Sequence, residues 1–227
     1  IEGYSGEGAG VARIDGFVVF VQGALRGEVC RVLILKVLRS VAFARVTELL
    51  APSPHRIAPD CPYFPRCGGC TYRHMDYEEE LALKRRRVQD NLARIGGSGV
   101  EVEEILGARE TARYRNKAQY PVSPSGAVGF YRARTHEVID TPTCLLVKRE
   151  AEAAAGAVRE YLRRGLADGY DERTGRGLVR HVYVRSNAEG GCLICLLVNG
   201  ESLPHEGELV ALLRRACPSA VGIVLGV

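Results

Sequence analysis

Three cysteines of the chain lie close together in the sequence and could bind a metal centre. Five residues separate Cys61 from Cys67, two separate Cys67 from Cys70, and the glycines Gly68 and Gly69 let the backbone wrap closely around an inorganic group. A structural zinc ion or an iron-sulfur cluster needs four thiolate ligands. The spacing therefore predicts a fourth cysteine ligand from elsewhere in the chain.

Cys144 is the best candidate for the fourth ligand, because it follows the polar turn Thr141-Pro142-Thr143, where a thiolate can face out of a strand end. Cys192 and Cys195 form a second pair with metal-ligand spacing, which keeps a zinc ribbon as an alternative. They lie in an apolar, strand-like run, where residues three apart point to opposite faces, so we interpret them as core residues. The spacing alone does not choose between zinc and iron.

A basic segment interleaved with aromatic residues predicts contact with RNA. Within 26 residues the chain carries six cations, Arg109, Arg113, Arg115, Lys117, Arg132 and Arg134, and four rings, Tyr114, Tyr120, Phe130 and Tyr131. Cations can pair with phosphates while rings stack on unpaired bases, as in single-stranded RNA recognition. The alternative is a solvated face with tyrosines in the core. Our candidate RNA-binding residues are Arg113, Arg115, Lys117 and Arg132.

The composition is that of a folded protein without a membrane span. The 227 residues are 46% hydrophobic and 26% charged, the formal net charge is +4, and no apolar run is long enough to cross a bilayer. The small positive charge permits a polyanionic partner without requiring one. No secretory signal is visible, so we expect a cytoplasmic protein with thiols rather than disulfides. The oligomeric state cannot be read from the sequence.

Two domains are expected, giving an α+β protein. Residues 1–52 read as short antiparallel strands, typical of a small closed β-barrel like the oligonucleotide-binding fold, and the prolines from Pro52 onward mark a linker. Residues 53–227 predict a mixed α/β domain that carries the cysteine loop. Its expected helices cover 77–95, 149–165 and 206–217, with strands between and after the last two.

These motifs resemble those of the RNA (uracil-5-)-methyltransferase family, most closely its 23S ribosomal RNA branch. The N-terminal motifs Gly6-Glu7-Gly8-Ala9-Gly10-Val11-Ala12 and Phe20-Val21-Gln22-Gly23-Ala24-Leu25 are similar to its TRAM domain. The later motifs are similar to its cluster loop and central domain: Cys61-Pro62, Cys67-Gly68-Gly69-Cys70, Tyr77, Lys84, Tyr114-Arg115-Asn116-Lys117-Ala118, Gly129-Phe130-Tyr131, His136, Cys144 and Leu178-Val179-Arg180-His181. One departure is Arg26, where the family usually has proline.

The resemblance implies a set of roles. Cys61, Cys67, Cys70 and Cys144 would hold a 4Fe-4S cluster, and the barrel and central domain would bind ribosomal RNA. In the family's chemistry a cysteine thiolate adds to C6 of uridine, C5 takes the methyl group of S-adenosyl-L-methionine, and a base removes the C5 proton.

The catalytic parts of that family lie in a C-terminal Rossmann-like domain whose motifs this chain lacks. We therefore interpret the chain as a fragment and expect no catalytic residue, no S-adenosylmethionine-binding residue and no activity in it alone. The helix over 77–95 is expected to pack on that further domain. Two alternatives remain. One is a stand-alone RNA-binding module, and the other is a relative of tRNA methylthiotransferases, which is disfavoured because their barrel follows the radical core.

Overall fold

The computed structural model describes residues 1–227, and the chain divides into two compact units. The first unit comprises residues 1–62 and 71–107, and the second comprises residues 63–70 and 108–227. The division differs from the boundary expected near residue 52. The helix after the cysteine loop belongs to the first unit. Residues 63–70 of the loop, which include Cys67 and Cys70, belong to the second, where Gly68 N–H donates to the Tyr131 carbonyl at 2.9 Å.

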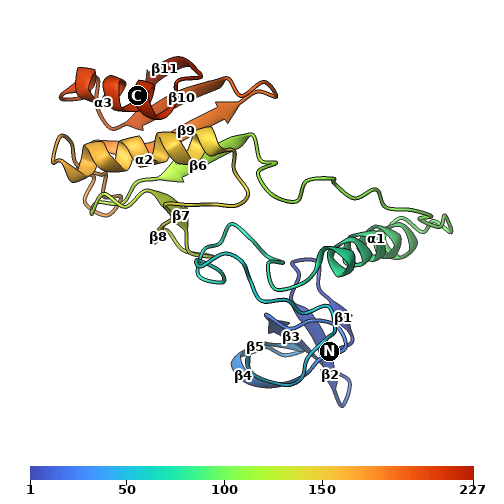
Figure 1. Ribbon diagram of the computed structural model, residues 1–227. Helices are drawn as coiled ribbons and strands as arrows, with labels where there is room; N and C mark the ends of the chain where they lie inside the picture. Colours follow the sequence, from blue (N-terminus) through green and yellow to red (C-terminus); the bar gives the residue numbers. More distant parts are fainter. The chain divides into compact units, whose positions relative to one another are not determined.

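The first unit is built on a five-stranded sheet in the order β1-β2-β3-β5-β4 (Figure 1). Its strands are β1 (Gly3–Tyr4), β2 (Gly10–Ile14), β3 (Phe17–Gln22), β4 (Val29–Val37) and β5 (Val41–Ala51). The expectation of purely antiparallel pairing was wrong, because β3 and β5 run parallel. The β4–β5 hairpin follows β3, and it folds back so that β5, its second strand, pairs with β3.

Hydrogen bonds from Ile1 bring the two edges of this sheet together at one end. The Ile1 amino group donates to the Glu28 carbonyl, and Gly27 N–H donates to the Ile1 carbonyl, both at 2.8 Å. The two edges are thus joined by isolated hydrogen bonds and not by a continuous β-ladder. Inside, alternate residues of β3 and β5 form the core, with Val19, Val21 and Ala44 at most 3% exposed.

Helix α1 (Tyr77–Arg94) completes the first unit, close to the range expected. Asp76 caps it by accepting the Glu79 N–H at 2.8 Å, and the glycines after Ile95 end it. Its buried residues are Glu79 and Leu83, and Leu83 packs with Leu25 and Met75 of the same unit. The packing of its other faces on a further domain stays a prediction.

The second unit is a two-layer α/β structure. Its main sheet has the order β11-β10-β9-β6, with β10 and β11 parallel and the other neighbours antiparallel. These strands are β6 (Lys117–Pro121), β9 (Val179–Ser186), β10 (Cys192–Val198) and β11 (Ala220–Gly226), and a separate hairpin is formed by β7 (Gly129–Tyr131) and β8 (Val138–Asp140). Helices α2 (Arg149–Arg163) and α3 (Glu206–Ala216) cover one face of the main sheet (Figure 1).

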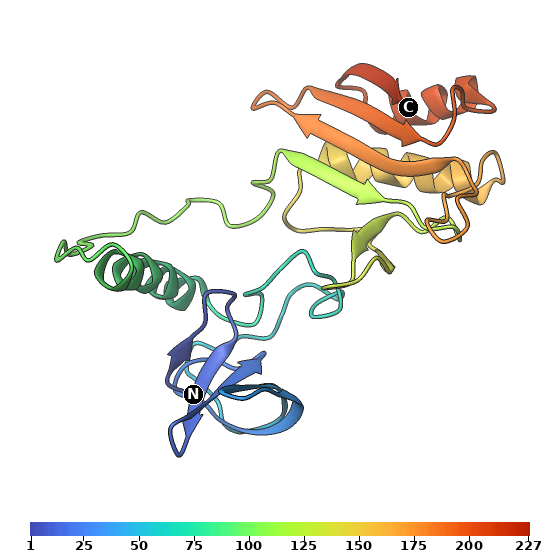
Figure 2. The same cartoon turned by 180° about the vertical axis from the view of Figure 1, so that it is seen from behind.

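The core of the second unit lies between that face and the helices. The alanine-rich side of α2 packs closely, and Tyr161, fully buried, donates its hydroxyl to the Pro204 carbonyl. Val182 and Val184 of β9 and Ile194 of β10 point into the same core. The opposite face of the sheet carries no helix (Figure 2). None of the three helices in the chain is apolar and long enough to cross a membrane.

Candidate nucleic-acid interface

The four cysteines expected to hold a cluster are thiols that are neither fully buried nor fully exposed. Cys61 belongs to the first unit, and Cys67, Cys70 and Cys144 belong to the second. Gly69 N–H donates to the Cys67 sulfur at 3.4 Å, a bond that a metal-bound thiolate can also accept. No group of three or more histidine, cysteine or acidic side chains is placed to hold a metal ion. The four-cysteine site therefore stays a prediction.

The second cysteine pair lies in the sheet as expected. Cys192 is 1% exposed and faces the helices, whereas Cys195, three residues along β10, is only partly buried. Burial raises the pKa of the neighbouring Cys217 thiol to about 12. Side chains that alternate across a strand cannot ligate one ion together, so the zinc-ribbon alternative fails for this pair.

Two of the predicted RNA-binding arginines are engaged within the second unit. Arg113 has a left-handed backbone (φ 56°), and its Nη1 donates to the Cys144 carbonyl at 2.9 Å and pairs with the Glu152 carboxylate at 2.6 Å. Arg132 pairs with Glu137 at 2.7 Å, with both side chains partly exposed. Arg113 thus holds the segment that carries Cys144, and its contact with RNA stays a prediction.

The other two predicted residues are exposed and carry no carboxylate partner. The Arg115 backbone pairs with the segment before α2, where its N–H donates to the Leu146 carbonyl at 2.9 Å. Lys117 begins β6 and lies opposite Arg185 of β9. The Arg115 and Lys117 side chains are therefore accessible to phosphates. Arg185, which is also exposed, adds a cation to this surface that was not among the predicted RNA-binding residues.

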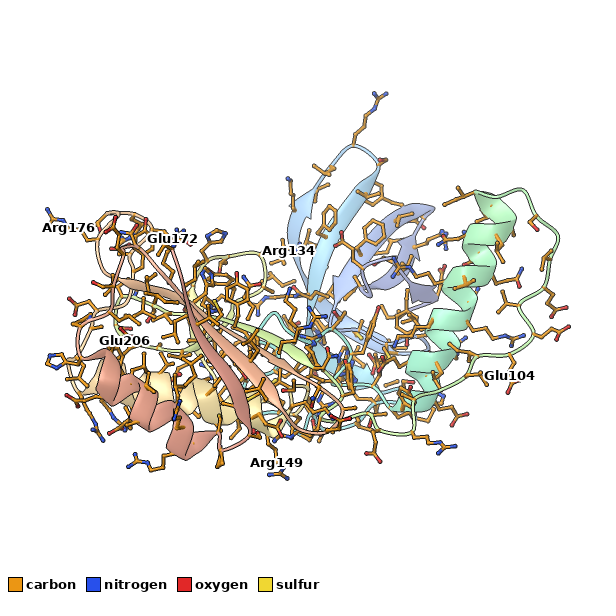
Figure 3. The ribbon with its side chains drawn as sticks, turned by 90° about the horizontal axis from the view of Figure 1, so that it is seen from above. Glu104, Arg134, Arg149, Glu172, Arg176 and Glu206 are labelled. Carbon is orange, nitrogen blue, oxygen red and sulfur yellow. The ribbon has the colours of Figure 1, made fainter.

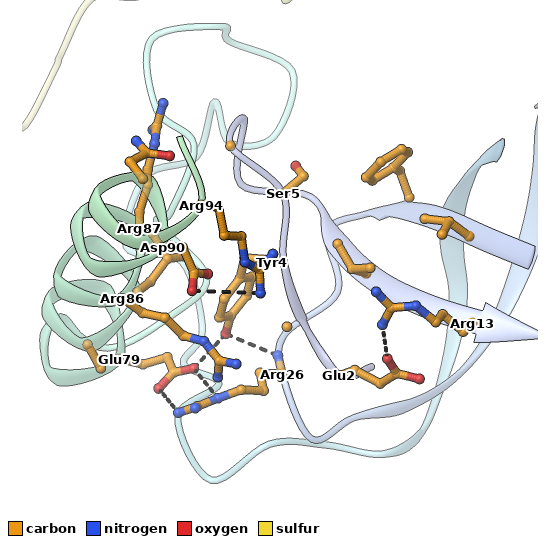
Figure 4. A pocket seen from close by; sticks show the side chains of 18 of the residues that line it. Glu2, Tyr4, Ser5, Arg13, Arg26, Glu79, Arg86, Arg87, Asp90 and Arg94 are labelled. Atoms are coloured by element: carbon orange, nitrogen blue, oxygen red, sulfur yellow. Dashed lines mark hydrogen bonds and ion pairs between the residues drawn. The ribbon is translucent and has the colours of Figure 1, made fainter. Parts of the chain in front are cut away.

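A second basic site, outside the residues proposed from the sequence to bind RNA, lies in the first unit. A cavity of about 540 Å³ opens between strands β1–β3 and α1 (Figure 4). Its lining includes the rings of Tyr4 and Phe20 and five arginines: Arg13, Arg26, Arg86, Arg87 and Arg94. Arginines of α1 recur on the side that faces the sheet, and this periodicity was the available signal.

Carboxylates neutralise only part of this cavity's charge. Glu2 pairs with Arg13 at 2.5 Å, Glu79 with Arg26 at 2.9 Å, and Asp90 with Arg94 at 3.8 Å (Figure 4). The remaining two lining arginines, Arg86 and Arg87, have no ion-pair partner. The cavity therefore combines aromatic surface with uncompensated positive charge, the composition that suits a nucleic-acid strand.

Comparison with known proteins finds a matching domain family and similar proteins. Residues 1–47 match the TRAM domain family. Two similar proteins are both named as uncharacterized RNA methyltransferases. The Clostridium tetani protein is 36% identical over 99% of this chain, and the Halalkalibacterium halodurans protein is 39% identical over 100% of it. The aligned regions are 50% and 51% of those proteins, so the chain spans about half the length of the curated relatives it matches.

A solved structure shares the fold. It is the Pyrococcus abyssi tRNA (uracil-54, C5)-methyltransferase in complex with S-adenosyl-L-homocysteine, with a TM-score of 0.69 and 18% identity. The match covers 92% of this chain and 47% of that one. At this identity the likeness concerns the fold. The chain thus has an N-terminal TRAM domain, and it is similar in sequence to RNA methyltransferases.

Proposed function

We propose that this chain is the RNA-binding part of an S-adenosylmethionine-dependent methyltransferase that acts on C5 of uridine in 23S ribosomal RNA. The observation that carries the proposal is the similarity, over essentially the whole chain, to proteins named as RNA methyltransferases. The TRAM match and the exposed cations of both units support RNA as the partner.

The chain's own residues act in this proposal by binding and orienting RNA. Arg115 and Lys117 pair with phosphates. Arg113 and Arg132 hold neighbouring loops, and their exposed sides contact the RNA. S-adenosyl-L-methionine supplies the methyl group when bound, and we assign neither its binding nor the attack on uridine to a residue described here.

The function is tested in cells by deleting the gene that encodes this chain. Nucleosides of purified 23S ribosomal RNA and transfer RNA are then measured by mass spectrometry. We expect 5-methyluridine to fall in the ribosomal RNA only. A fall confined to transfer RNA would assign the enzyme to that substrate instead, and unchanged 5-methyluridine in both would overturn the methyltransferase proposal.

We further propose that Cys61, Cys67, Cys70 and Cys144 hold a 4Fe-4S cluster. The donor chemistry fits, because all four are partly accessible thiols and soft thiolates are the ligands that iron-sulfur clusters use. The Gly69 N–H bond to Cys67 Sγ is an interaction that tunes such clusters. Four protein ligands would leave no iron open, so the cluster is assigned a structural role.

The cluster proposal has a readout that does not depend on methylation. Protein purified without oxygen should be brown, with broad absorbance at about 400 nm and iron and sulfide in equal amounts. Cys144→Ala should lose both colour and iron. Cys195→Ala, the matched control on the outer side of β10, should keep them. A colourless wild-type protein with stoichiometric zinc, or without metal, would overturn the assignment.

RNA binding by the chain itself is the third test. Affinity for a short labelled oligoribonucleotide should fall steeply with salt, because each phosphate contact releases counterions. Arg115→Ala and Lys117→Ala should each weaken binding and reduce the salt dependence. Binding that does not respond to salt would mean that these cations do not contact the phosphates.

A further inference from the structure

The outer side of β9 carries a row of polar and aromatic side chains on an uncovered sheet face. Val182 and Val184 point into the core, so the alternate residues His181, Tyr183 and Arg185 point to the opposite face of the sheet. No helix covers that face (Figure 2). The rings of His181 and Tyr183 lie 5.9 Å apart, which confirms that they share a face.

The neighbouring strand extends this surface. In the antiparallel ladder Lys117 lies opposite Arg185, Gln119 opposite Tyr183, and Pro121 opposite His181. Two cations directly opposite each other repel, and neither Lys117 nor Arg185 has a carboxylate partner. A polyanion between them would relieve this repulsion. The β10–β11 half of the same face is apolar instead, with Leu193 and Val224 44% and 46% exposed.

At the His181 end, the face runs into a cavity of about 480 Å³ inside the second unit. The other walls are the turn at 123–125, the β7–β8 hairpin and the loop at 170–173. Tyr131 and His136 of the hairpin stack at 5.2 Å and 23°, and Glu172 of the loop holds His136 Nδ1 at 2.7 Å. Figure 3 shows Glu172 in that loop. The cavity is within the size range of small-ligand sites.

Two polar atoms in the cavity wall are buried without a hydrogen-bond partner. They are His181 Nδ1 and Arg180 Nε. Burial and the adjacent Arg180 guanidinium lower the pKa of His181 against the opposing effect of Glu172, so its imidazole is neutral at physiological pH. An unpaired buried polar atom costs free energy, and a ligand that bonds to it recovers that cost.

We propose that this surface binds a single-stranded RNA segment, with phosphates on Lys117 and Arg185, a base stacked on Tyr183, and an unstacked base in the cavity beside His181. The proposal rests on the proposed function and names the surface that performs it. A nucleobase offers a ring face for stacking and donors and acceptors on its edge. The cavity admits a base that has left its helix, so an unpaired strand is favoured over a duplex.

Photo-crosslinking locates the bound strand directly. The wild-type chain is irradiated with a short oligouridylate that carries 5-iodouridine, and the adducts are mapped by mass spectrometry. We expect adducts on Tyr183 or Tyr131. Adducts confined to the first unit, residues 1–62 and 71–107, would overturn this proposal and leave RNA binding intact. Absence of any binding would overturn the proposed function as well.

Variants measure the contribution of each contact by fluorescence anisotropy with the same oligouridylate. Tyr183→Ala should raise Kd about tenfold or more, whereas Tyr183→Phe, which keeps the ring, should bind as wild type. Arg185→Gln should lower the slope of log affinity against log salt by about one. Arg163→Gln removes the same charge from an exposed position on α2 and should change neither value.

Competition with an unlabelled duplex tests whether the surface prefers single-stranded RNA over double-stranded RNA. An unlabelled duplex should displace the labelled strand much less effectively than unlabelled oligouridylate does. Wild-type Kd values in both Tyr183→Ala and Arg185→Gln, in chains that still bind RNA, would overturn the assignment of this surface. Equal displacement by duplex would overturn the preference for a single strand.

Discussion

The Glu28 carboxylate is buried and is held by two nitrogens of Arg56, which donate from Nε at 2.5 Å and from Nη2 at 2.8 Å. The Leu25 N–H bonds to the same carboxylate at 2.7 Å. Burial alone would raise the pKa of Glu28, but the Arg56 guanidinium and the backbone donors outweigh it and lower the pKa. This pair fastens the segment after β5 to the β-sheet that precedes it.

Arg56→Ala should destabilise the protein strongly, because it leaves a buried carboxylate without its cation. We expect the free energy of unfolding to fall by about 3–5 kcal/mol, measured by urea denaturation followed by circular dichroism. Arg13→Ala is the matched control. Its partner Glu2 is about half exposed, so the loss should stay below about 1 kcal/mol. Equal losses in the two variants would contradict this account.

His55 and Asp76 make the stability of the first unit depend on pH. His55 Nδ1 lies 2.9 Å from Asp76 Oδ2, and this bond, with smaller effects of Glu78 and Glu79, raises the pKa of His55. Burial raises the pKa of Asp76, but the Glu79 N–H and His55 outweigh it and lower the pKa. The bond joins the linker to the residue that caps α1.

The direction of the pH dependence of stability follows from the pKa shifts of His55 and Asp76. The histidine contribution is complete below its ordinary pKa of about 6.5 and is lost as pH rises through the raised value, whereas the aspartate contribution is lost as pH falls below about 4. The Tm difference between wild type and His55→Gln should therefore be largest between about pH 4 and 6.5 and should shrink above that range. A difference that grows toward pH 9 would contradict the assignment.

Charge reversal at Arg185 should change stability and RNA binding in opposite directions. Arg185→Glu places a carboxylate opposite Lys117 and replaces repulsion with attraction, so we expect a gain of about 0.5 kcal/mol in urea denaturation. The same variant should weaken oligouridylate binding at least tenfold. Arg163→Glu on α2 should leave the affinity unchanged. A variant that loses both stability and binding would indicate a structural role for Arg185.

Local patterns predicted the helices well. The cap Asp76 and the glycines after Ile95 bracket α1, and small apolar residues at helical spacing placed α2 within two residues of its observed end. The order strand, strand, helix, strand at the end of the chain was also predicted. These features depend on neighbours within a few positions, which is the information that a periodicity carries.

Features that depend on distant pairing were not predicted. The parallel contact of β3 with β5 is decided by where the β4–β5 hairpin returns, and no local pattern of Phe17–Gln22 encodes it. The alternation of β9 was readable, but only the sheet order shows that His181 and Tyr183 face away from both helices. The basic residues of 109–134 were visible in the sequence, whereas the engagement of Arg113 by Glu152 was not.

Arg26 shows how a departure from the resembled family's pattern can be accommodated. Its guanidinium pairs with Glu79 of α1 at 2.9 Å, and its N–H donates to the Tyr4 hydroxyl at 3.0 Å, while that hydroxyl donates to Glu79 at 2.8 Å (Figure 4). The Glu79 side chain is only 3% exposed. Arg26 therefore supplies the cation that a buried carboxylate needs.

Arg26→Ala should cost about 1–3 kcal/mol of unfolding free energy, less than a fully buried pair because the arginine side chain is 42% exposed. Adding Glu79→Gln removes the unpaired charge, so the double variant should be more stable than Arg26→Ala alone. Arg26→Pro should be the least stable of the three, since proline also removes the N–H that Tyr4 accepts. Additive losses in the double variant would show that Arg26 and Glu79 do not act as a pair.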